Sequence, residues 1–120
     1  AEKAPKSPAL PYYLGTALKL KGDLDQAVES YRTAYLMATG EEEGWKGPAL
    51  AGVALACEEG KKWEEAKKAW QDYVSWAGGK TPKPDLTDVA KKRIEAIEAV
   101  EDLEKAYAPV RDLIQNPKTP

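Results

Sequence analysis

Two runs of carboxylates are the groups in this sequence with the clearest potential for chemistry. Glu41-Glu42-Glu43 and Glu58-Glu59 are residue types that can hold a divalent metal ion or exchange protons with a substrate. The sequence contains no histidine, which removes the commonest general base and the imidazole metal ligands. It also lacks a glycine-rich phosphate loop and a Gly-x-Ser-x-Gly nucleophile motif. Acidic runs of this kind are typical of solvated loops and helix ends, so we predict no enzyme activity, no metal and no cofactor.

Composition and charge narrow the classes of partner. The chain has 120 residues, a formal net charge of -2 and no basic stripe interleaved with aromatic residues, so nucleic acid is not an expected partner. No apolar run reaches the ~18 residues that a membrane-spanning helix requires, so membrane insertion is not expected. Cys57 is the only cysteine and follows the apolar run GVALA, which predicts a small core residue and not a reactive thiol.

Five segments carry apolar residues at helical spacing. We predict helices over about 8–21, 24–39, 48–59, 63–77 and 85–114, and therefore an all-α fold. Gly22 should end the first helix, since glycine readily takes the left-handed conformation that closes a helix. Short turns near residues 22 and 60 make two helical hairpins. The glycines of segment 40–48 predict a loop between the hairpins.

The last segment is longer than the others and has a different pattern. Its apolar residues alternate mainly by three and four, which gives one long apolar seam along a helix. Pro109 should kink or restart this helix, because proline lacks an N–H and crowds the carbonyl four residues back. The part from Val100 to Ile114 exceeds what a cap on the hairpins needs. Packing within the chain, self-association and docking to a partner all remain open for it.

Self-comparison reveals an internal repeat. When Ala27 is aligned with Ala66, Tyr31 falls on Trp70 and Leu24 falls on Trp63, all at an offset of 39 residues. The glycine between the helices does not keep this offset, since Gly22 lies five residues before Ala27 and Gly60 lies six before Ala66. The comparison therefore predicts two related hairpins, with one extra residue in the second turn.

This repeat resembles the tetratricopeptide repeat, a helix-turn-helix unit of about 34 residues. The closest matches to the pattern of that family are Leu14, Gly15, Gly22, Ala27, Tyr31 and Ala34, and the looser ones are Val53, Ala54, Gly60, Ala66 and Trp70. The longer period and a missing proline at the repeat end depart from the pattern. The resemblance implies repeats over about 9–39 and 48–78, stacked as a fragment of an α-α superhelix and capped by the long helix.

The resemblance also implies where a partner would bind. In this family the first helix of each hairpin lines a concave groove for an extended or helical peptide. The matching positions are Tyr12, Thr16, Lys19 and Leu20 in the first repeat, and Ala51, Leu55, Glu58 and Glu59 in the second. Tyr12 is either the aromatic anchor of this site or a cover for the open end of the hairpin. Trp45 is either a packing residue or a second contact point.

Together these patterns predict one helical domain over residues 9–115, with a linker or mature N-terminal tail at 1–8 and a disordered tail at 116–120. The expected function is that of a scaffold or adaptor, which binds a partner protein in its groove within a larger assembly. The alternative is a homodimerisation module that associates through the seam of the C-terminal helix. The start of the chain, rich in Ala, Pro and Lys, suits a periplasmic or membrane-tethered bacterial protein, and equally an interdomain linker. A cytoplasmic location is the less favoured alternative.

Overall fold

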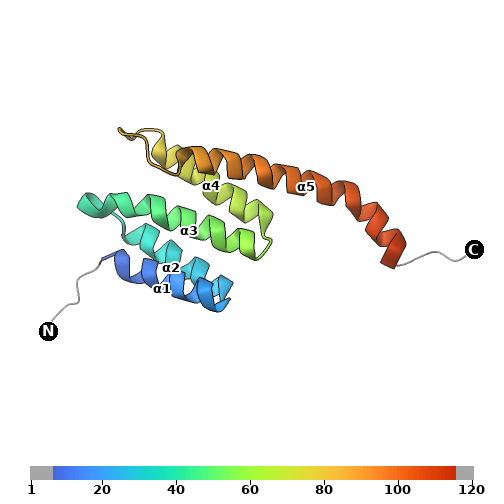
Figure 1. Ribbon diagram of the computed structural model, residues 1–120. Coiled ribbons are helices and arrows are strands. Elements are labelled where there is room, and N and C mark those ends of the chain that lie inside the picture. The colour runs from blue at the N-terminus through green and yellow to red at the C-terminus, as the bar shows by residue number, and fades with distance from the viewer. Residues whose placement is uncertain (1–6, 116–120) are drawn as a thin grey trace, which may run out of the picture.

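The computed structural model describes residues 7–115, and the fold of this part is all-α. Its five α-helices and one short 3-10 helix are α1 (Ala9–Lys21), α2 (Leu24–Met37), η1 (Gly40–Trp45), α3 (Lys46–Glu59), α4 (Trp63–Ala77) and α5 (Thr87–Gln115). Each α-helix packs against the next one in the chain, and neighbours run antiparallel (Figure 1). The prediction of five helices with a long C-terminal one is therefore confirmed. The predicted tails at 1–8 and 116–120 lie outside the described residues, apart from Ser7 and Pro8.

Both hairpins close with the same backbone turn. Gly22, after α1, is left-handed with a φ of 91°, and Lys61, after α3, is left-handed with a φ of 59°. The next residues, Asp23 and Lys62, each donate their N–H to the carbonyl five residues back, at 2.9 and 2.8 Å. The two left-handed residues are 39 apart, the same offset as the repeated core residues. Two residues separate α1 from α2 and three separate α3 from α4, which agrees with the predicted extra residue in the second turn. Gly60 lies one position before Lys61, the residue that takes the left-handed conformation.

The residues that repeat at the offset of 39 form the centre of the core. All six are buried: Ala27 and Ala66, Tyr31 and Trp70, Ala34 and Tyr73. The small residues let the helices approach closely, and the aromatic residues fill the space between them. Cys57 is also buried, as predicted, and this burial raises the pKa of its thiol.

Tyr31 connects the two hairpins. A Cβ built on Gly15 of α1 would lie 2.9 Å from the Tyr31 ring, and one built on Gly52 of α3 would lie 2.6 Å from it. These distances are too short for carbon atoms in contact, so neither glycine can carry a side chain without displacing the ring. The ring is therefore held between the backbones of two helices. The sequence indicated the role of Gly15, but Gly52 falls outside the repeat alignment.

The connection between the hairpins is more ordered than the loop we predicted. Residues 40–45 form η1, and α3 begins directly after it, two residues earlier than expected. Glu43 fixes this segment to the end of α4, because its carboxylate accepts hydrogen bonds from Trp76 Nε1 and Lys80 Nζ, both at 2.6 Å. These two bonds hold the pKa of Glu43 below its ordinary value. The chain before α1 is also packed, since Pro8 is fully buried.

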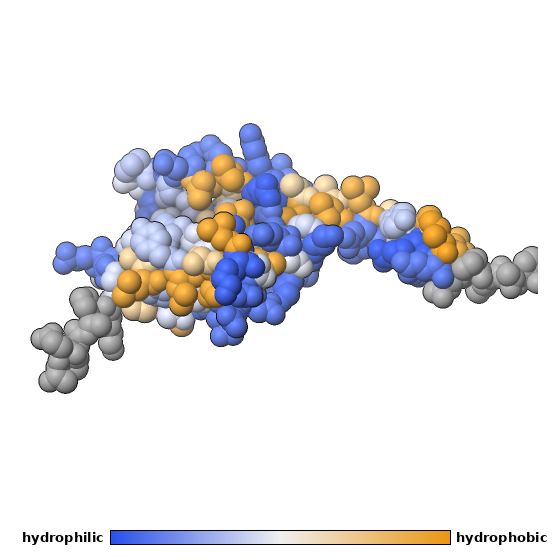
Figure 2. All heavy atoms as spheres, turned by 60° about the horizontal axis from the view of Figure 1, so that its bottom comes forward, coloured by the Kyte–Doolittle hydropathy of each residue, from blue (hydrophilic) through white to orange (hydrophobic). Residues whose placement is uncertain are grey.

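One face of α1 is left uncovered by the other helices of residues 7–115. Leu10, Leu14 and Leu20 are exposed on it, and Figure 2 shows the resulting apolar band over this part of the molecule. The sequence predicted an apolar stripe on α1, but only Gly15 of this helix is buried. The helix therefore packs through Gly15, with Tyr12 and Leu18 partly buried against the core, and it leaves its three exposed leucines accessible.

Helix α5 gives the molecule its elongated shape. Its buried residues are Thr87, Ala90 and Ile97, all in the half that packs on α4, and the remainder projects past the body (Figure 1). The molecule measures 73 × 36 × 17 Å, and its radius of gyration is 18.0 Å, against about 13–14 Å for a compact chain of this length. The helix continues through Pro109 without restarting, and its last turns bend (Figure 1). No helix in residues 7–115 has both the length and the apolarity needed to cross a membrane.

Candidate functional site

A shallow groove crosses the face of the molecule on which α1, α3 and α5 lie side by side. It has a volume of about 420 Å³ and is lined by Lys19, Leu55, Glu58, Glu59, Trp63 and Arg93. Lys19 belongs to α1, the next three residues to α3, Trp63 begins α4, and Arg93 lies on α5. Four of these six residues are among the partner-binding positions predicted from the sequence. The structure thus brings together side chains from two hairpins and from α5.

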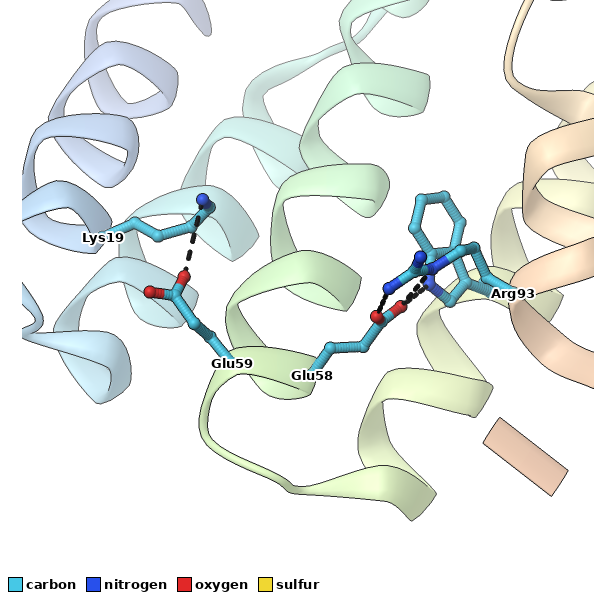
Figure 3. A network of polar contacts seen from close by, with 5 residues as sticks. Lys19, Glu58, Glu59 and Arg93 are labelled. Atoms are coloured by element: carbon cyan, nitrogen blue, oxygen red, sulfur yellow. Dashed lines mark hydrogen bonds and ion pairs between the residues drawn. The ribbon is translucent and has the colours of Figure 1, made fainter. Parts of the chain in front are cut away.

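Glu58 is the fixed charge of this groove. Its carboxylate accepts hydrogen bonds from Trp70 Nε1 at 2.6 Å and from Arg93 Nε at 3.1 Å, and Arg93 Nη2 contacts its other oxygen (Figure 3). Only 10% of the Glu58 side chain is exposed. A bidentate arginine contact and an indole donor together satisfy this carboxylate. Glu58 therefore joins α3 to α4 and α5, and it presents little free charge to a ligand.

Glu59 carries a looser contact on the other side of the groove. Its carboxylate lies 3.6 Å from Lys19 Nζ (Figure 3), and 53% of its side chain is exposed. A pair at this distance with a half-exposed carboxylate contributes little to stability, because water screens the Glu59 charge. The charged groups of a ligand can therefore replace the contact between Lys19 and Glu59 at a small cost in free energy.

The floor of the groove between these two charged contacts is apolar. Leu55 is 41% exposed, and Trp63 is half-buried beside it. A partly exposed indole next to an accessible leucine offers a contact area for an apolar side chain. Trp63 and Arg93 were not among the predicted binding residues. The prediction covered only the first helix of each hairpin, and these two residues lie on α4 and α5.

Tyr12 and Thr16 lie further along α1, in an aromatic cluster. The Tyr12 ring lies 5.4 Å from the rings of Tyr13, Tyr31 and Trp45, measured between centroids. Thr16 Oγ1 is 2.8 Å from Tyr31 Oη and donates to the Tyr12 carbonyl at 3.3 Å. Burial is the main cause that raises the pKa of the Tyr12 hydroxyl. This geometry places Tyr12 and Trp45 as packing partners over the end of the first hairpin.

The remaining predicted positions do not line the groove. Leu20 is exposed on α1, and Ala51 is buried in the core. The acidic run 41–43 lies in η1. In the described part of the chain, no group of three His, Cys, Asp or Glu side chains has an arrangement that could hold a metal ion.

Comparison with models of known protein families, with curated proteins and with solved structures finds no match for this chain.

Proposed function

We propose that this chain is a tetratricopeptide-like interaction module that binds a segment of a partner protein in the groove between α1, α3 and α5. The two hairpins support this, since their core residues and their left-handed turn residues recur at one offset. The groove supports it too, because the first helix of each hairpin contributes side chains to it.

The pattern of exposed side chains within the groove gives the strongest support for this function. Leu55 is accessible at its floor, and the Lys19–Glu59 pair beside it is held only loosely. An extended segment with one large apolar side chain fits this arrangement, with the apolar side chain over Leu55 and Trp63. Charged groups of the segment replace the contact between Lys19 and Glu59. Apolar contact supplies affinity in such a site, and the charges set the register.

Selection from a random peptide display library tests this function, because it needs no knowledge of the natural partner. Peptides selected on the wild-type chain should contain one large apolar residue flanked by charges. They should bind a Leu55→Arg variant at least about tenfold more weakly, because a buried unpaired guanidinium is costly.

Leu36→Arg is the matched control, since Leu36 is an exposed leucine on α2 that does not line the groove. This variant should bind the same peptides as the wild type does. Equal loss in both variants, or no loss in Leu55→Arg, would remove the groove as the binding site.

A further inference from the structure

The C-terminal half of α5 has an apolar face with no partner in the described chain. Val100, Leu103, Tyr107, Val110 and Ile114 follow one another at steps of three, four, three and four. The last four are exposed, Leu103 by 69%. This spacing is the a/d pattern by which helices pair in coiled coils. We call these five residues the α5 seam.

The α5 seam cannot be covered by α4. The residues that pack α5 on α4 are Ala90, Ile94 and Ile97, with Glu101, whose carboxylate lies 2.8 Å from Lys67 Nζ of α4. At about 100° per residue, the seam lies roughly 130° around the helix from this packed stripe. C-terminal to Glu101, the side of α5 that faces α4 no longer touches it. An open cleft lined largely by charged residues separates α5 from the start of α4 there. An apolar cover must therefore come from outside the described chain.

We propose that a second copy of this chain covers the α5 seam, as an antiparallel helix pair with a defined register. In this register Tyr107 faces Val110 of the second copy, and Leu103 faces Ile114 of the second copy. Each layer joins side chains whose sizes are compatible, and the two-fold axis repeats both layers. The body of each copy then lies beyond the far end of its partner's helix, so the two bodies do not collide.

Charge complementarity selects this register. Glu104 and Arg111 each follow a seam residue directly and flank the same edge of the seam, where Arg111 lies over the Tyr107 ring at 5.8 Å. In the antiparallel register Glu104 faces Arg111 of the second copy, and the two-fold axis makes this pair twice. A parallel arrangement places Glu104 and Arg111 opposite Ala99 and Ala106, and it forms no ion pair. Only the antiparallel pair is thus complementary in both shape and charge.

The expected dimer is weak. Five large side chains, the exposed seam residues and Leu113, bury about 100 Å² each in each copy, which gives a total on the order of 1,000 Å². That total is at the lower end of specific interfaces, so association should appear at micromolar concentrations and above.

Sedimentation equilibrium from about 10 µM to about 1 mM chain tests the proposal. The wild type should show a monomer–dimer equilibrium, and Tyr107→Asp should abolish it. Glu104→Arg and Arg111→Glu should each weaken the dimer by roughly tenfold or more, since each replaces two attractive contacts by two repulsive ones. The double variant should restore association, and so should a mixture of the two single variants, in which the charges again match.

Two controls keep these outcomes interpretable. Lys105→Glu reverses a charge on the same turn away from the seam, and it should leave the dimer unchanged. Circular dichroism and urea unfolding at low concentration should show that every variant is folded, because no seam residue past Val100 is buried. A chain that stays monomeric throughout the range overturns the proposal. A dimer that neither single reversal weakens, or that the mixture fails to restore, overturns the antiparallel register.

Discussion

The left-handed residues of the two inner turns show how the same backbone is built with different side chains. Gly22 takes this conformation without steric cost, whereas Lys61 takes it with a Cβ that crowds its own backbone. The second turn is therefore strained at one residue, although glycine is present one position earlier. The hydrogen bonds that follow each turn are equivalent, so the fold tolerates this strain.

Lys61→Gly should stabilise the protein by about 0.5–1 kcal/mol, because it relieves the left-handed strain at a small cost in chain entropy. Urea unfolding measures the change. Gly22→Lys, which introduces the same strain in the first turn, should destabilise by a similar amount. If Lys61→Gly destabilises the chain, the lysine side chain contributes more than the strain costs.

At the scale of residues, the core was more predictable from the sequence than the lining of the groove. Ala27, Tyr31 and their repeat partners were predictable, because small and aromatic residues at fixed spacing serve a packing function that recurs in the chain. The sequence did not decide whether Tyr12 packs within the chain or contacts a partner. Spacing along one helix does not show which side chains of other segments contact that helix. Arg93 was missed for the same reason, because its contact with Glu58 spans 35 residues.

The two halves of α5 differ in how they pack, although the sequence shows one continuous pattern of apolar residues along the helix. Ile97 is buried between α5 and the hairpins, while Leu103, two turns further on, is exposed. Apolar periodicity predicted the whole helix correctly, since helix formation depends on local spacing. It did not predict where packing ends, because that depends on the length of α4, the helix beneath.

Ile97→Ala should lower the free energy of unfolding by about 2–4 kcal/mol, as expected when a buried aliphatic side chain is truncated. Leu103→Ala should change it by less than about 0.5 kcal/mol under the same conditions. Both values are measured by urea unfolding at concentrations too low for self-association. Similar losses for the two variants would mean that the C-terminal half of α5 packs on the body of its own chain.

The whole molecule consists of a compact helical layer and a projecting helix. The layer, with the first half of α5 packed on it, contains the buried residues of the described chain, and the projecting second half of α5 accounts for the long axis of 73 Å. The all-α class and the order of helices followed from the sequence. The elongated shape did not, because an apolar seam is equally compatible with a helix that folds back and with one that extends outward.

A chain that ends after residue 101 should keep its stability to within about 1 kcal/mol, since none of residues 98–115 is buried. Its radius of gyration, measured by small-angle scattering, should fall from the 18.0 Å of the full chain towards that of a compact domain. A large loss of stability in this shortened chain would show that the projection supports the body.

The position of Tyr31 has a consequence for how this chain can be divided. Its ring belongs to the first hairpin by sequence, but it rests on Gly15 of that hairpin and on Gly52 of the second. A fragment that contains the first hairpin alone would expose one side of this ring, and a fragment that starts at α3 would leave the surface around Gly52 uncovered. Each hairpin should therefore be less stable alone than in the intact chain. We expect the unit that folds to be larger than the unit that repeats in the sequence.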